Sequence, residues 1–137
     1  NIKYNYIDVT IDVSNATNLM VSGYKNEFMQ TLLNVVNNAK EQIKEARENK
    51  LIKRGSIFIQ IYNYSKKVII DIKDNGGGIP IDKMPNIFDA YYTTKEQGHG
   101  IGLYMSKLII EDKMGGKIRA SNTLTGACFT ITLGNAV

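Results

Sequence analysis

The segment DNGGGIP, residues 74–80, places three consecutive glycines between an aspartate with its asparagine and an isoleucine-proline pair. A second glycine-rich segment, GHGIGL, follows at residues 98–103. Glycine is used where the chain needs a positive φ or where another group must approach the main-chain amides closely. Two such segments so near each other in the sequence predict one ligand held between them.

The composition indicates one globular domain. The chain has 137 residues, of which 43% are apolar and 22% charged, with a formal net charge of +4. A chain of this size and composition can bury a single core. We found no signal peptide and no apolar run long enough to span a membrane. Because the sequence starts abruptly and without Met, we expect a domain excised from a longer protein.

The charge pattern and the single cysteine bear on partners and compartment. Positive residues between positions 40 and 54 alternate with glutamates, a pattern typical of a solvated helix face and not of a nucleic-acid interface. Cys128 is the only cysteine, so no internal disulfide can form. We therefore expect a cytoplasmic domain, whether or not its parent protein is anchored in a membrane.

Hydrophobic periodicity predicts the order of the elements. Alternating apolar residues indicate strands, and apolar residues three and four apart indicate helices. Strands cluster instead of alternating with helices, which favours an α+β fold with a mixed, largely antiparallel sheet and helices on one face. The predicted elements are strands at 7–13 and 19–23, a helix at 25–49, a hairpin at 56–63 and 67–74, a helix at 102–114, and strands at 115–122 and 126–133.

Several common sites are excluded by spacing. The glycines at 98–102 follow GxGxG and not the dinucleotide pattern GxGxxG, and no phosphate-binding GxxxxGK[ST] pattern occurs. One Cys and one His cannot supply paired Cys/His metal ligands. A Ser-His-Asp triad would have to use His99, whose place in a glycine loop does not orient a base rigidly.

Four segments together resemble a known family. They are NVVNNAKE (34–41), DNGGGIP (74–80), IFDAYYTTK (87–95) and GHGIGLYMSKLIIE (98–111). In this order they resemble the N, G1, F and G2 boxes of the ATP-binding catalytic domain of bacterial sensor histidine kinases. That domain belongs to a wider group with gyrase, mismatch-repair and heat-shock chaperone ATPases. The resemblance covers residues 7–133.

The resemblance implies a Bergerat-type fold, a two-layer α/β sandwich with about five strands packed on about three helices. In such a fold ATP lies between the long helix and a lid. The resemblance makes Asn38 the Mg²⁺ ligand, and a neutral amide oxygen suits a cation that fills its shell with water and phosphate. Asn34 lies one turn earlier on the same helix face. On residue type alone, both amides could instead make hydrogen bonds inside the core.

Asp74 is the candidate for recognising the base. A carboxylate accepts hydrogen bonds, and adenine presents an N6 amine where guanine presents an O6 acceptor. A buried Asp74 would therefore select adenine, although an aspartate before Asn-Gly can also simply start a turn. Gly76 and Gly78 would let the main chain lie against the base and sugar, and Ile79 would cover the ring.

The second glycine segment is the candidate for holding phosphates. Gly98, Gly100 and Gly102 precede a helix, whose free amides favour phosphate oxygens. Lys95 is the candidate for a γ-phosphate contact, while Phe88 reads either as a lid anchor or as a core residue. The predicted catalytic residues are Asn34 and Lys95. The predicted nucleotide-binding residues are Asn34, Asn38, Glu41, Gln42, Asp74, Gly76, Gly78, Ile79, Phe88, Thr93, Thr94, Lys95, Gly98, His99, Gly100, Ile101, Gly102 and Leu103.

The sequence departs from the family pattern at two positions. Kinases of this resemblance often carry Lys three residues after the metal-binding Asn, where this chain has Glu41. They often read Gly-Thr before the last strand, where this chain has Gly126-Ala127 and so lacks a hydroxyl beside the aspartate. Because of these departures, an alternative function stays open, in which the chain is a degenerate nucleotide-binding module that signals without catalysis.

The function implied is transfer of the γ-phosphate of MgATP to a histidine on a partner helical domain, with a response regulator downstream. A serine-directed kinase of the anti-sigma type resembles the same boxes. A gyrase-type hydrolase has Glu where this chain has Asn34, which favours a kinase. The only histidine, His99, lies in the lid, so we expect no autophosphorylation by the isolated domain, which should be a monomer. We expect this domain to contact neither nucleic acid nor membrane.

Overall fold

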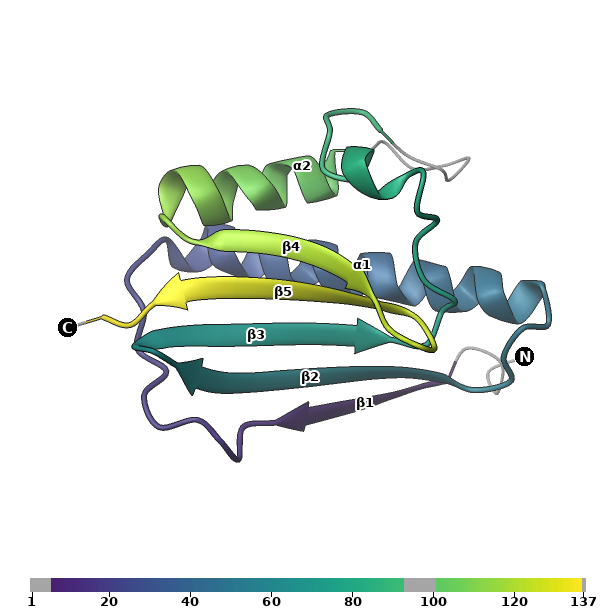
Figure 1. Cartoon of the computed structure of the whole chain (residues 1–137), viewed down its shortest axis with the longest axis horizontal. Helices are drawn as coiled ribbons and strands as arrows, with labels where there is room; N and C mark the ends of the chain where they lie inside the picture. The colour runs from purple at the N-terminus through teal and green to yellow at the C-terminus, as the bar shows by residue number, and fades with distance from the viewer. Residues whose placement is uncertain (1–5, 93–100, 137) are drawn as a thin grey trace.

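The computed structural model describes residues 6–92 and 101–136. Within these residues the chain forms two long helical segments and one sheet (Figure 1). The elements are β1 (Ile7–Asp12), α1 (Lys25–Glu48), β2 (Gly55–Tyr64), β3 (Lys67–Asp74), η2 (Met84–Asn86), α2 (Gly102–Lys107), η3 (Leu108–Lys113), β4 (Lys117–Asn122) and β5 (Ala127–Gly134).

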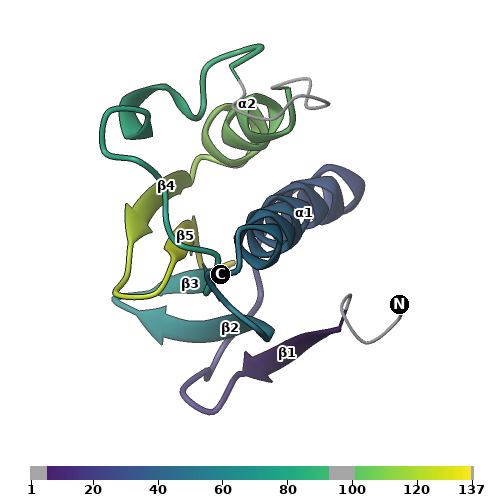
Figure 2. The same ribbon diagram turned by 90° about the vertical axis from the view of Figure 1, so that its right-hand side faces the viewer.

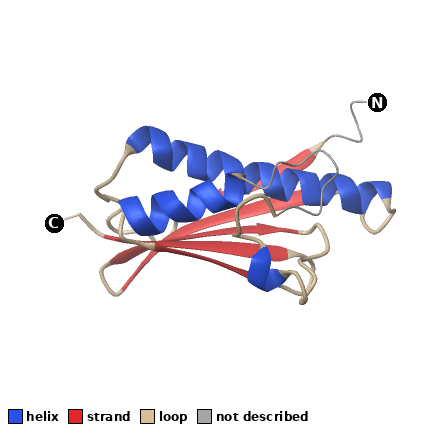
Figure 3. Cartoon of the chain, turned by 90° about the horizontal axis from the view of Figure 1, so that it is seen from above, coloured by secondary structure: helices blue, strands red, loops and turns tan. Residues whose placement is uncertain are grey.

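The sheet has five strands in the order β1-β2-β3-β5-β4. β1 pairs with β2 in parallel, and the other three pairs are antiparallel. Both α1 and α2 lie on the same face of the sheet, as the end-on view of Figure 2 and the view from above in Figure 3 show. The predicted α+β sandwich with a mixed, largely antiparallel sheet is therefore confirmed.

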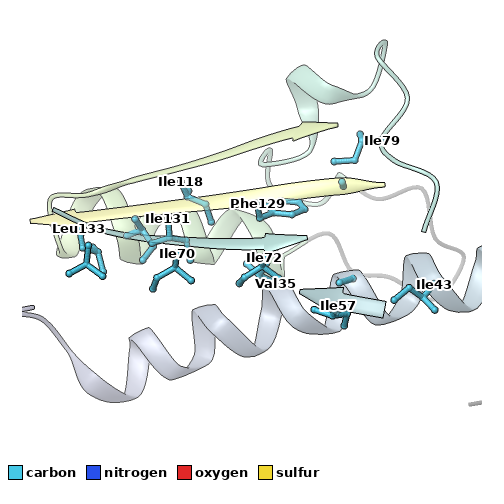
Figure 4. Packing of buried hydrophobic residues seen from close by; sticks show 14 residues of the cluster. Val35, Ile43, Ile57, Ile70, Ile72, Ile79, Ile118, Phe129, Ile131 and Leu133 are labelled. Carbon is cyan, nitrogen blue, oxygen red and sulfur yellow. The ribbon is translucent and has the colours of Figure 1, made fainter. Parts of the chain in front are cut away.

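The core lies between α1 and the covered face of the sheet. α1 buries Val35, Ala39 and Ile43 at a spacing of four residues, which places them on one side of the helix. Alternate residues of the central strands, such as Ile70 and Ile72, point toward this side (Figure 4). Strand residues alternate between faces, so Asp71 and Thr130 lie on the opposite face of the sheet, together with the buried Ile69.

Two local predictions differ from the structure. Residues 19–23 form no strand; among their carbonyls, that of Met20 accepts one main-chain hydrogen bond of 2.7 Å, from the amide of Ala136. One such bond is not a ladder, so these residues follow the chain after β5 without extending the sheet. The helix predicted at 102–114 starts as α-helix α2 and continues as the π-helical segment η3. Its last turn closes with the bond from Met114 N to Ile109 O, at 3.0 Å.

Candidate functional site

The candidate site forms at the end of β3, the central strand of the sheet (Figure 1). Asp74 is the last residue of β3 and is only 4% exposed. Its Oδ1 accepts hydrogen bonds from the amides of Gly76 at 2.8 Å and Ala127 at 3.4 Å. Two segments 51 positions apart thus hold one carboxylate oxygen, which fixes the orientation of a buried hydrogen-bond acceptor.

The first glycine segment packs directly against α1. A Cβ on Gly76 would lie 2.8 Å from the carbonyl carbon of Gln42, closer than side chains tolerate. Gly77 and Gly78 have φ values of 95° and 85°, a region that side chains disfavour. Contact with the helix and main-chain conformation are therefore two reasons for glycine in this segment, independent of any ligand.

The turn between β4 and β5 forms the next wall of the site. A Cβ on Gly126 would lie 1.9 Å from the carbonyl oxygen of Asp74. The amide of Gly77 donates to the carbonyl of Thr125 at 3.1 Å, which joins the same turn to the glycine segment. The sequence at Ala127 indicates only a missing hydroxyl, whereas in the structure the main-chain amide of Ala127 donates to Asp74. Gly126, which directly precedes Ala127, was the feature of the sequence that could have indicated this close packing.

Asn122, at the end of β4, was not predicted as part of the site. Its Oδ1 accepts from the amide of Ile79 and its Nδ2 donates to the carbonyl of Ile79, both at 2.8 Å. Ile79 itself is 8% exposed and belongs to the hydrophobic core. The two residues are 43 positions apart, so no local pattern could have paired them.

The second glycine segment meets α1 at Asn34. The Asn34 Nδ2 donates to the carbonyl of Gly102 at 3.2 Å and to Ser106 Oγ at 3.3 Å. Ser106 is fully buried, and its hydroxyl also donates to the Gly102 carbonyl at 2.8 Å. Gln30 donates to the Oδ1 of Asn34 at 3.0 Å. Asn34 therefore contacts the second glycine segment at Gly102, and its side-chain amide links the two helices.

α1 therefore touches both glycine segments, with Asn38 midway between the contacts. Asn34 meets Gly102, and Gln42 meets Gly76. Eight helical residues separate these contacts, a span of about 12 Å. Asn38 and Gln42 are half-buried, while Glu41 is exposed. This arrangement brings the predicted N-box and glycine residues along one side of a single helix.

Phe88 packs on the core. Its ring meets that of Phe129 edge-on with centroids 6.1 Å apart, and the Lys107 Nζ lies 5.6 Å from its centroid. Ile101 and Leu103 are half-buried, and Leu103 packs against the same core. Phe88 thus anchors the segment after η2 to both β5 and α2.

Six predicted residues lie outside the described part of the chain, namely Thr93, Thr94, Lys95, Gly98, His99 and Gly100. Within residues 6–92 and 101–136, no group of three His, Cys, Asp or Glu side chains could hold a metal ion. In the same residues, no helix has the length and hydropathy needed to cross a bilayer.

Known proteins share both the sequence and the fold. Residues 23–136 match the family of histidine kinase-, DNA gyrase B- and HSP90-like ATPases. The chain is 40% identical over 105 residues to the signal transduction histidine-protein kinase AtoS of Escherichia coli (strain K12). That match covers 76% of this chain and spans 16% of the length of AtoS.

Solved structures agree with this result. The catalytic domain of the histidine kinase ThkA superimposes with a TM-score of 0.81 at 32% identity, covering 98% of this chain and 82% of that one. A crystal structure of ThkA in complex with the response regulator protein TrrA gives a TM-score of 0.76 at 28% identity, covering 98% of this chain and 36% of that one. The resemblance inferred from the four boxes is thereby confirmed: the chain belongs to the histidine kinase-, DNA gyrase B- and HSP90-like ATPase family.

Proposed function

We propose that residues 1–137 form one ATP-binding catalytic domain of a sensor histidine kinase, whose phosphoacceptor and sensor domains lie elsewhere in a longer parent protein. The observation that carries this proposal is the position of Asn38 on α1, between the contacts that Gly102 and Gly76 make with the same helix. The chain spans only 16% of the length of AtoS, which supports a parent protein with further domains.

The base would bind at Asp74. This buried carboxylate can accept a hydrogen bond from the N6 amine of adenine and would repel the O6 of guanine. The amides of Gly76 and Ala127 hold its Oδ1 in one orientation, so the selection does not depend on a mobile side chain. Ile79, supported by Asn122, would cover the ring.

Asn38 would hold Mg²⁺. The donor set fits this ion, because the candidate ligand is a neutral amide oxygen and the described residues offer no cluster of carboxylates that would form an all-protein cage. When bound, Mg²⁺ neutralises charge on the phosphates. Gly102, at the start of α2, lies beside Asn34 and would place the main chain near the triphosphate. Lys95, Thr93 and Thr94 remain predicted phosphate contacts.

The reaction would be transfer of the γ-phosphate to a histidine on the helical domain of the same kinase. Imidazole is already nucleophilic, so the domain has only to position ATP and stabilise charge. A response regulator would act downstream, which the complex of ThkA with TrrA supports by analogy. The relatives are named as histidine kinases, which favours this function over a serine-directed kinase.

We further propose that the isolated chain is a cytoplasmic monomer that contacts neither nucleic acid nor membrane. Its single histidine, His99, belongs to the lid in the family pattern. Incubation of this chain alone with MgATP should therefore leave no acid-labile phosphate on it.

Calorimetric titration with MgADP and MgGDP tests the nucleotide site. The wild-type chain should prefer MgADP, and Asp74→Asn should weaken MgADP binding by roughly tenfold or more, as expected for a hydrogen bond to a charged group. Asp71→Asn is the matched control, because Asp71 lies on the same strand and is 9% exposed, but bonds to Tyr62 and Thr130 on the other face.

Preserved binding in Asp71→Asn, together with its loss in Asp74→Asn, supports the site. Phosphotransfer from the wild-type domain to a supplied histidine-bearing helical domain then tests the kinase activity. Equal binding of the two nucleotides by wild type would contradict the base assignment and favour an interaction module.

A further inference from the structure

The conformation of the glycine segment needs support that the sheet does not supply. β3 ends at Asp74, which is opposite Ile57 of β2, while the pairing of β3 with β5 ends at Lys73. Beyond this point Gly77 and Gly78 turn the chain through positive φ values. Main-chain groups in such a turn require partners from outside the ladder.

Asn122 supplies these partners for Ile79. One carboxamide accepts from the amide and donates to the carbonyl of the same residue, each at 2.8 Å, as a neighbouring strand would. A Cβ on Gly78 would lie 3.0 Å from the Asn122 Oδ1, so the turn is also packed against this side chain. Asn122 thereby determines where the main chain of residues 78 and 79 lies relative to Asp74.

Asn122 is well suited to a positioning role and poorly suited to a role in the core. The residue is exposed and lies at the end of an edge strand, so its removal opens no cavity among buried side chains. In the described part of the chain, both hydrogen bonds of its side chain go to Ile79. A change at Asn122 should consequently act on the glycine segment more than on the stability of the fold.

We propose that Asn122 is a positioning residue of the adenine site, which holds Ile79 and the preceding glycines in the conformation that accepts the base. It acts through Ile79 and does not itself touch the nucleotide. This inference rests on the proposed function, because it presupposes that adenine binds beside Asp74 and Ile79.

The test compares Asn122→Ala with Asn135→Ala. Asn135 also donates its side-chain amide to main-chain carbonyls, those of Asn18 at 2.8 Å and Met20 at 3.4 Å. It follows β5 at the opposite end of the sheet from Asp74, since Gly134 pairs with Lys67 at the start of β3. The two variants thus lose similar bonds at different ends of the molecule.

Calorimetry with MgADP and MgGDP gives the decisive measurement. Asn122→Ala should bind MgADP about tenfold more weakly, as expected when one or two neutral hydrogen bonds are lost. It should also lose part of the preference for MgADP over MgGDP, which a general loss of folded protein would not change. Asn135→Ala should keep both the affinity and the preference of wild type.

A second measurement follows the main chain directly. Hydrogen exchange at the Ile79 amide should accelerate in Asn122→Ala while amides in the middle of β3 and β5 stay protected. Wild-type affinity and preference in Asn122→Ala would overturn the positioning role, as would an equal loss for both nucleotides. If wild type itself shows no preference for MgADP, the proposed base site fails, and the role of Asn122 fails with it.

Discussion

At the scale of single residues, the site depends on side chains that are absent as much as on those present. Gly126 leaves room for the main chain of Asp74, and Gly76 leaves room for α1 at Gln42. In both places another part of the protein, and not the ligand, occupies the space that a side chain would fill. At these two positions the glycines are therefore explained by close packing within the protein, without any contact to a nucleotide.

Replacement of Gly126 by alanine should disturb the fold and the site together. The new Cβ would lie 1.9 Å from the Asp74 carbonyl oxygen, so the β4–β5 turn or the end of β3 must move. We expect a loss of about 1–3 kcal/mol in the free energy of unfolding, as for overpacked interiors. Chemical denaturation measures the loss, and titration with MgADP should show weaker binding.

Gly134→Ala is the matched control for this change. Within the described residues, and apart from its two chain neighbours, no atom lies within 4 Å of the position that its Cβ would take, and Gly134 also belongs to β5. Its free energy of unfolding should stay within about 0.5 kcal/mol of wild type. Equal stability of the two variants would show that the turn relaxes around Gly126 without strain.

At the scale of elements, local patterns predicted most of what the structure contains. The helix over Lys25–Glu48 and the strands of the central hairpin follow from apolar periods that only need neighbouring residues. The four boxes predicted Asn34, Asp74 and Gly102 as site residues, and these lie on elements that meet. Their roles toward a nucleotide stay predictions.

Features that depend on distant partners could not be predicted. Asn122 pairs with Ile79 across 43 positions, and Asn34 bonds to Ser106 across 72. Residues 19–23 have an apolar pattern typical of a strand, yet they pair with no strand of the sheet that the described residues form. Whether a short apolar segment becomes a strand is decided by its tertiary surroundings, which the sequence does not display.

The hairpin between β2 and β3 offers a stabilising change. Its two-residue turn places Ser65 and Lys66 at φ values of 49° and 63°. This left-handed conformation is strained for most residues, and Asn and Gly adopt it most easily. The double change Ser65→Asn with Lys66→Gly should raise the free energy of unfolding by about 1 kcal/mol. Lys66→Ala leaves a residue with a side chain at the same positive φ, so it should not raise the free energy of unfolding.

Chemical denaturation distinguishes these hairpin variants. The turn is at the opposite end of β3 from Asp74, because Tyr64 pairs with Lys67 and Ile57 pairs with Asp74. MgADP affinity should therefore remain that of wild type in all of them. A gain in Lys66→Ala equal to that of the double variant would show that main-chain strain is not the cause.

At the scale of the whole molecule, the two faces of the sheet have different chemistry. One face is covered by helices and is apolar, whereas the other carries a polar network around Asp71. Tyr62 donates to the Asp71 Oδ2 at 3.1 Å, and Thr130 donates to the Oδ1 at 2.6 Å. Cys128 lies beside this network and is 6% exposed.

Burial raises the pKa of the Cys128 thiol, and the nearby charge of Asp71 raises it further, against the lowering effects of the Thr130 hydrogen bond and the Lys73 charge. The folded state therefore favours the neutral thiol more strongly than the unfolded state does. This contribution to stability is complete below the ordinary thiol pKa of 9.0 and is lost as pH rises through the higher folded pKa.

The free energy of unfolding should accordingly fall above pH 9.0, and Cys128→Ala should make this fall shallower. Urea denaturation between pH 7 and 10.5 measures how steeply the free energy of unfolding falls with pH in wild type and in Cys128→Ala. The neutral range is the internal control, because the thiol should not make the stability of either protein depend on pH there. Parallel curves for wild type and Cys128→Ala throughout the alkaline range would contradict a role for the thiol.

The strand order also bears on how the protein is made. β5 follows β4 in the chain, yet it lies between β3 and β4 in the sheet. During synthesis β4 leaves the ribosome before β5, the strand that joins it to the rest of the sheet. Asn122, at the end of β4, and Gly126, in the following turn, therefore cannot take their final positions until β5 is made. The nascent chain can form α1 and the β2–β3 hairpin early, but the wall around Asp74 closes only after β5 has been translated. If the proposed site is correct, nucleotide binding to a ribosome-bound chain should begin only when β5 has been translated, because the Ala127 amide that holds Asp74 belongs to β5.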